Sequence, residues 1–143
     1  MTLVDTNILL YLANREAPQH ERVAKWTEQL FASRENVGLP WPTIWGFLRI
    51  STNIRLWPRS TASAAEAFAH IREWLTQPGV TVVTPGPRHA ELLEHLVTQY
   101  AASGPLVSDA VLAAIALEHG ATLASTDRDF SRFPDLKWVN PLE

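Results

Sequence analysis

The chain has 143 residues, of which 46% are hydrophobic and 19% charged, and its formal net charge at pH 7 is −3. This composition predicts one compact domain over residues 1–143, with a proper core and no apolar run long enough to span a membrane. Cysteine is absent, which excludes disulfides, zinc ribbons and thiol nucleophiles, and no secretion signal is recognisable, so we expect a cytoplasmic protein. Nucleic-acid binders are commonly basic, so this chain would need a local patch, a metal site or a partner's positive charge to bind nucleic acid.

The first half of the chain is predicted to contain one strand and three helices. In chain order we expect a strand at 2–4, a short helix at 7–13, a helix from Pro18 to about Phe31, a turn bounded by Pro40 and Pro42, and a helix from about Thr43 to Thr52. Ile44, Phe47 and Leu48 form the expected inner face of the last helix.

The second half begins with a capping box formed by Ser63 and Glu66, which opens a helix ended by Pro78–Gly79. Its expected inner stripe is Ala64, Phe68, Ile71 and Leu75. After it we expect a strand at 80–83, a helix at 88–101, a helix from an N-cap at Ser108 to His119 with Gly120 after it, and strands at 121–125 and 137–140. This alternation predicts an α/β sandwich with a mostly parallel sheet.

Aspartates occupy three informative places in these elements. Asp5 directly follows the first strand, Asp127 and Asp129 follow the strand "ATLAS", and Asp109 lies in the first turn of the helix before that strand. Singly, each has a simpler explanation: Asp5 as a helix cap, Asp109 as a helix-dipole charge, and Asp127 and Asp129 as turn residues. Together, the matching positions at strand ends favour a shared site.

Clustered carboxylates repel one another and are costly to bury, and a divalent cation resolves both problems. Oxygen ligands without histidine or cysteine suit Mg²⁺ or Mn²⁺ rather than zinc. The five histidines share no ligand spacing and are expected on helix surfaces.

At these residues the sequence resembles a PIN domain, specifically a VapC-type toxin ribonuclease of a type II toxin–antitoxin system. The matching segments are "LVDTNILLY" (3–11), "WGFLRISTN" (45–53), "SDAVLAAIALEHGATLASTDRDF" (108–130) and "WVNPL" (138–142). The resemblance implies a three-layer PIN-like sandwich with four to five short strands in a mostly parallel central sheet flanked by helices. It also implies an endoribonuclease that uses metal-activated water and leaves a 5′-phosphate and a 3′-hydroxyl.

The resemblance also implies the site residues and the partners. Asp5, Asp109 and Asp127 match three of the family's four acids and are expected to be catalytic ligands of Mg²⁺ or Mn²⁺. Asp129, Asn7 and Thr126 match variable or flanking polar positions. The expected partners are an RNA substrate, a cognate VapB-like antitoxin and a second copy of the chain in a homodimer, with no membrane.

Gly46 is the departure from the family pattern, because it occupies the place of the usual second acid, a glutamate. Two hypotheses follow. Metal binding is weaker or limited to one tightly held ion, or Asp129 or Asn7 with ordered water fills the gap.

Basic and aromatic residues surround this second helical region. Arg49, Arg55 and Arg59 are either a solvated helix end or phosphate contacts beside the site, and Arg128 is better explained by a local ion pair. Trp26 and Trp74 are expected in the core, whereas Trp41, Trp45 and Trp57 form either core or a docking surface for another chain.

Two other functions are compatible with parts of the sequence. A PIN-like module that binds RNA or protein without catalysis is favoured by the missing glutamate. A receiver-type phosphoacceptor domain would need an aspartate after a central strand, and "VTVVTPGP" (80–87) supplies none there. We rank the receiver below the other two.

Overall fold

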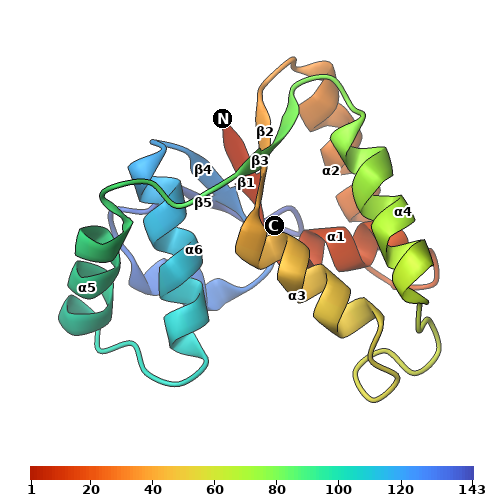
Figure 1. Ribbon diagram of the computed structural model, residues 1–143. Coiled ribbons are helices and arrows are strands. Elements are labelled where there is room, and N and C mark those ends of the chain that lie inside the picture. Colours follow the sequence, from red (N-terminus) through yellow and green to blue (C-terminus); the bar gives the residue numbers. More distant parts are fainter.

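The computed structural model describes residues 1–143 as five strands, six α-helices and one 3₁₀ helix (Figure 1). The elements are β1 Thr2–Val4, α1 Thr6–Ala13, α2 His20–Ala32, β2 Val37–Pro40, α3 Trp41–Ser51, α4 Ala64–Leu75, β3 Val80–Val83, α5 His89–Gln99, α6 Leu106–Glu118, β4 Thr122–Ala124, η1 Arg128–Arg132 and β5 Trp138–Val139. All five strands pair in parallel in the order β3-β2-β1-β4-β5. The predicted α/β fold with a parallel sheet is confirmed.

Helices cover both faces of the sheet, which gives three layers. In Figure 1, α5 and α6 lie to the left of the sheet, and α1, α2 and α4 lie to the right. Successive strand residues point to opposite faces. Accordingly Leu3 and Leu123 belong to the core under α5 and α6, while Val4 and Ala124 belong to the core under α1–α4.

Local signals in the sequence fix several helix ends. Ser63 Oγ accepts from Glu66 N at 3.1 Å and Glu66 Oε1 accepts from Ser63 N at 3.3 Å, so the capping box is formed. Gly120 has φ of +60° directly after the C-cap His119 of α6, as its predicted C′ position requires.

One strand was not predicted. Val37–Pro40 forms β2, paired with β1 and β3, where the sequence predicted only a turn. Glycine and proline normally argue against a central strand. Here Gly38 is required, because a Cβ at this position would lie 2.4 Å from Leu3 Cδ2 and 2.5 Å from Val83 Cγ2. Pro40 is the last residue of the strand, and α3 follows at once.

Two helix details also differ from expectation. Helix α6 begins at Leu106, so Ser108 lies in its first turn and makes no N-cap hydrogen bond. In α4 the buried residues are Ala67 and Ile71, whereas Phe68 is 46% exposed. The predicted stripe was right at Ile71 and Leu75, which meet the core, and wrong at Ala64 and Phe68, which are exposed. No helix combines the length and the apolar character that crossing a bilayer would need.

The strand order brings the carboxyl ends of β1 and β4 and the N-terminal turn of α6 to the same edge of the sheet. From the central strand β1, the chain builds outward through β2 and β3 on one side, then returns to add β4 and β5 on the other. The carboxyl ends of β1 and β4 thus border the point where the strand order reverses, the usual place for a site in parallel sheets. Helix α6 leads into β4, so its N-terminal turn lies at this same edge.

Candidate functional site

Asp5 lies at the carboxyl end of β1 and is held by a dense set of hydrogen bonds. Its backbone N donates to Ala124 O of β4 at 2.9 Å. Its Oδ1 accepts from Thr6 N at 2.7 Å, which caps α1, and its Oδ2 accepts from Ser125 Oγ at 2.7 Å and from Asn7 Nδ2 at 3.1 Å. The predicted capping role is real, and it leaves Oδ1 with further acceptor capacity, because a carboxylate has about four lone-pair sites.

Ser125 and Asn7 connect the two strand ends. Asn7 Nδ2 also donates to Ser125 Oγ at 3.0 Å, while Asn7 Oδ1 accepts from Thr126 N at 3.2 Å. Ser125 Oγ in turn accepts from Asp127 N at 3.0 Å. The loop that carries Asp127 is therefore fixed to the same residues that hold Asp5.

Asp109, Asp127 and Asp129 form the tightest acidic group in the molecule. Each offers a carboxylate oxygen, and these oxygens lie within 4.8 Å of one another. Asp127 Oδ1 accepts from Asp129 N at 2.9 Å, the turn contact expected for this pair. Asp5 lies outside this group of three, but it lines one pocket together with Asp109.

The electrostatics of the site link all four acids. Burial, followed by the charges of Asp127, Asp5 and Asp129, raises the pKa of Asp109 from 3.8 to about 6, although Arg132 acts against this. Burial also raises the pKa of Asp5, with a further contribution from the charge of Asp127. Hydrogen bonds from Ser125, Thr6 and Asn7 oppose that rise. An acidic cluster of this kind favours a bound cation.

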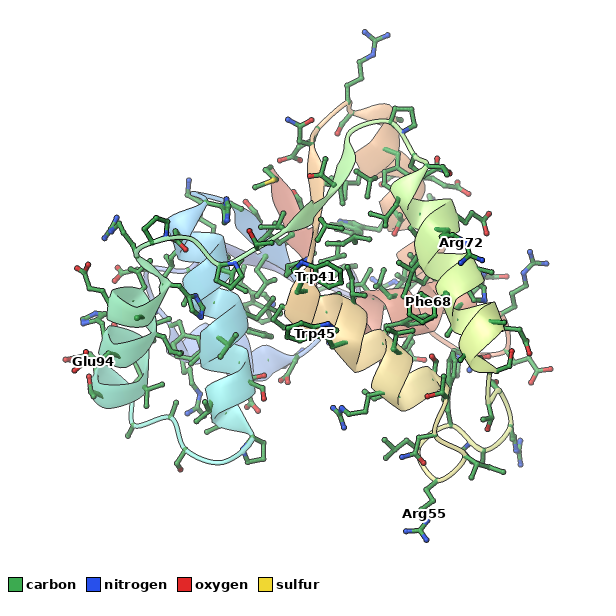
Figure 2. All side chains as sticks on the ribbon, in the orientation of Figure 1. Trp41, Trp45, Arg55, Phe68, Arg72 and Glu94 are labelled. Atoms are coloured by element: carbon green, nitrogen blue, oxygen red, sulfur yellow. The ribbon has the colours of Figure 1, made fainter.

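A pocket of about 510 Å³ opens beside the acids, between α1, α3 and α6. Gly46 lines it, and a Cβ there would lie 2.4 Å from Thr6 Oγ1. A side chain at position 46 would therefore require Thr6 to move, and Thr6 Oγ1 is engaged with Thr43 O at 3.0 Å. Arg49 also lines the pocket, whereas Arg55 lies outside it, on the loop that follows α3 (Figure 2).

Asn7 and Asp129, the two residues expected to replace the missing glutamate, differ in how free their side chains are to bind a cation. Asn7 uses both ends of its amide to connect Asp5, Ser125 and Thr126, so its Oδ1 keeps only one lone pair for a cation. Asp129 is exposed and already belongs to the group of three carboxylates. The structure therefore favours Asp129 over Asn7 for that role.

Sequence reasoning missed the residues that position the acids. Ser125 is fully buried, and Trp138 Nε1 donates to its backbone O at 3.0 Å. Thr43 Oγ1 donates to Val4 O at 2.7 Å and so connects α3 to β1. A small polar residue between an apolar strand and an aspartate is the one signal that could have identified Ser125. Arg128 pairs with Glu143, which confirms a local ion pair.

Comparison with known proteins decides the family. Residues 2–136 match the model of the PIN domain. The chain belongs to the PIN domain family. Ribonuclease VapC33 of Mycobacterium tuberculosis is 39% identical over 142 residues, covering 99% of each chain. Ribonuclease VapC37 of the same species is 36% identical over 141 residues, covering 99% of this chain and 97% of the relative. The predicted resemblance to VapC-type PIN ribonucleases is confirmed.

Several solved structures share this fold. VapBC2 from Rickettsia felis, bound to a promoter DNA fragment, superposes with a TM-score of 0.71 at 15% identity and covers 97% of each chain. VapBC-1 from nontypeable Haemophilus influenzae has a TM-score of 0.71 at 19% identity, covering 99% of this chain and 98% of that one. At these identities the likeness supports the architecture alone.

Proposed function

We propose that this PIN protein is a divalent-metal-dependent endoribonuclease and the toxin of a type II toxin–antitoxin pair. The observation that carries the proposal is the group of Asp109, Asp127 and Asp129 near the partly buried Asp5. It occurs in a chain that matches VapC ribonucleases over nearly its whole length. The sequence-based ligand set of Asp5, Asp109 and Asp127 is retained, and Asp129 is added to it.

The chemistry of these donors fits a hard cation. The group offers only carboxylate oxygens, which Mg²⁺ and Mn²⁺ prefer and zinc does not require. Burial and then repulsion from Asp127, Asp5 and Asp129 raise the pKa of Asp109, so the isolated cluster is electrostatically unfavourable when fully ionised. When bound, a divalent ion would activate water toward a phosphodiester and neutralise charge that develops on the phosphate.

The residues of the chain have separate tasks in this proposal. Asp109, Asp127 and Asp129 would hold the cation, and Asp5 would add a ligand whose position Ser125 and Asn7 fix. Thr126 contributes a backbone N–H that orients Asn7. Arg49, the one basic residue in the pocket lining, would contact an RNA phosphate.

The same proposal includes protein partners. One solved structure with this fold is a toxin–antitoxin complex from Klebsiella pneumoniae. We therefore expect a cognate VapB-like antitoxin, a homodimer of this chain, and a cytoplasmic location for the complex. An acidic pocket would accept a basic side chain from such a partner, which suits a chain of net charge −3.

The test measures Mn²⁺-dependent cleavage of RNA by Asp109→Asn, Asp127→Asn and Asp5→Asn proteins, with and without EDTA. Each variant is expected to lose more than about 100-fold of the activity, because even residues that only orient metal ligands cost 10- to 100-fold. Asp135→Asn is the matched control, since Asp135 is exposed and lies outside the acidic group. Full activity of the Asp109 or Asp127 variant, or EDTA-resistant cleavage, would contradict the proposal.

A binding module without catalysis is the second candidate, and Gly46 is the observation that favours it. The position beside Thr6 lacks a carboxylate and has no room for one without rearrangement. Calorimetric titration with Mn²⁺ separates the two candidates. Heat of binding together with cleavage supports the nuclease, whereas neither binding nor cleavage supports the module.

A further inference from the structure

Two exposed tryptophans mark one face of α3. Trp41 and Trp45 are 38% and 61% exposed, and their rings stack with centroids 6.0 Å apart and planes at 27°. The other four tryptophans of the chain are all at least partly buried. Large aromatic side chains left in water in this way commonly mark a binding surface.

This aromatic pair continues directly into the acidic pocket. Trp41, Trp45 and Arg49 are spaced by four residues and therefore follow one side of the helix. Figure 2 labels both tryptophans at the N-terminal end of α3, and Trp45 lines the pocket that α6 also borders. Trp45 and Arg49 line the pocket from α3, and Asp109 lines it from α6. The exposed ring and the carboxylates thus share one cavity.

The pocket has the size of a site for a small ligand, and its lining includes charged residues. Its volume of about 510 Å³ falls in the range of ligand sites. Only three of its eleven lining residues are hydrophobic. Gly46 lines the pocket without a side chain, and a Cβ there would lie 2.4 Å from Thr6 Oγ1.

We propose that this pocket is a nucleotide subsite, in which an unpaired RNA base stacks on Trp45 while Arg49 contacts the phosphate next to it. The proposal rests on the ribonuclease function proposed above and places the scissile phosphate at the acidic group. A base offers a flat face for Trp45, and its phosphate offers negative charge for Arg49. Because the base must leave a helical stack to reach Trp45, the enzyme would cut next to unpaired nucleotides.

The charged residues of the lining suit a phosphate-carrying ligand at this place. An anchor pocket for a protein side chain is usually apolar at its centre. Here the lining includes the charged residues Asp5, Asp109 and Arg49 beside the hydrophobic residues Trp45, Ile50 and Leu112. The phosphate of such a ligand would contact Arg49, and a cation bound with the ligand would contact Asp5 and Asp109.

The test compares Trp45→Ala, Trp45→Phe and the wild type, using a single-stranded RNA that contains 2-aminopurine beside its cleavage site. Binding is measured with Ca²⁺ in place of Mn²⁺, and cleavage is measured separately with Mn²⁺. Wild type and Trp45→Phe should quench 2-aminopurine fluorescence on binding. Trp45→Ala should lose the quenching and bind about 10- to 100-fold more weakly, as expected for loss of one base stack.

Two further variants sharpen the interpretation. Phe68→Ala is the matched control, because Phe68 is an exposed aromatic residue on α4 that does not line the pocket, and it should behave as wild type. Arg49→Gln should reduce the slope of log affinity against log salt by about 0.7, the loss of one phosphate contact on a single strand. Circular dichroism confirms that each variant is folded.

The outcomes separate this proposal from the function on which it rests. If the wild type cuts RNA and Trp45→Ala binds and quenches equally well, the subsite is wrong and the nuclease stands. If Trp45→Ala leaves RNA binding unchanged but loses binding to the antitoxin, the face serves a protein and the subsite is also wrong. If the wild type neither binds nor cuts RNA, both proposals fail.

Discussion

Asp5 shows how one side chain can have a structural and a chemical task. It caps α1 through Thr6 N, and its other oxygen accepts from Ser125 and Asn7. These hydrogen bonds stabilise its ionised form, although burial and the charge of Asp127 act in the opposite direction. Because this carboxylate is already fixed, it would lose little additional conformational entropy on binding a cation. The cap and the proposed ligand role are therefore compatible.

At the residue scale, Asp109 should make the metal-free protein sensitive to pH. Its pKa is about 6 in the folded chain and near 3.8 when unfolded. Between these values the folded state binds more protons, so stability falls as pH rises through this window. In EDTA, Asp109→Asn should therefore raise the melting temperature relative to wild type at about pH 7.5, with a smaller effect near pH 4.

Thermal unfolding followed by circular dichroism at both pH values measures this difference. Asp135→Asn serves as the control, because Asp135 is exposed and does not belong to the acidic group. A difference between Asp109→Asn and wild type that is equal at the two pH values would show that repulsion in the cluster is not its cause.

At the element scale, a short strand forms because neighbouring strands pair with it, whereas the start of a helix can be set by local capping residues. Residues Val37–Pro40 are all buried, and β2 exists because β1 and β3 pair with it on both sides. The start of α4, in contrast, is encoded locally by Ser63 and Glu66. The sequence therefore predicted α4 and missed β2.

The capping box gives a stability prediction for α4. Ser63→Ala removes the acceptor for Glu66 N and should lower the free energy of unfolding by about 1 kcal/mol. Urea denaturation measures the change. Ser103→Ala is the control, because Ser103 is exposed and caps no helix, and it should change stability by less than about 0.5 kcal/mol. Equal effects of the two substitutions would contradict the role of the cap.

At the scale of the whole molecule, the site exists because every strand is parallel. Asp5, Asp127 and the first turn of α6 reach one edge of the sheet only when β1 and β4 are neighbours. The same edge receives α3 directly after β2, which brings Trp45, Gly46 and Arg49 to the acids. Residues separated by more than a hundred positions thus build one pocket.

A cation at this edge should stabilise the folded molecule. Ligands that bind only the native state add free energy by mass action, about 2.7 kcal/mol at a concentration 100 times the dissociation constant. Excess Mn²⁺ should therefore raise the melting temperature of the wild type by roughly 5–10 °C. Asp127→Asn should remove most of this shift, and Asp135→Asn should retain it. An equal shift in the Asp127→Asn protein would locate the binding elsewhere.

The sequence alone was sufficient for the α/β class, most helices and the family, whereas the choice of aspartates stays a prediction. These depend on local periodicity, caps and the residues that follow strands, all of which are short-range properties. The tertiary structure decided what depends on non-local packing. It added β2, placed Asp129 rather than Asp5 in the tightest acidic group, and left Arg55 outside the pocket. It also showed that Ser125 and Asn7 join β1 to β4, since hydrogen bonds across more than a hundred residues leave no periodic trace in the sequence.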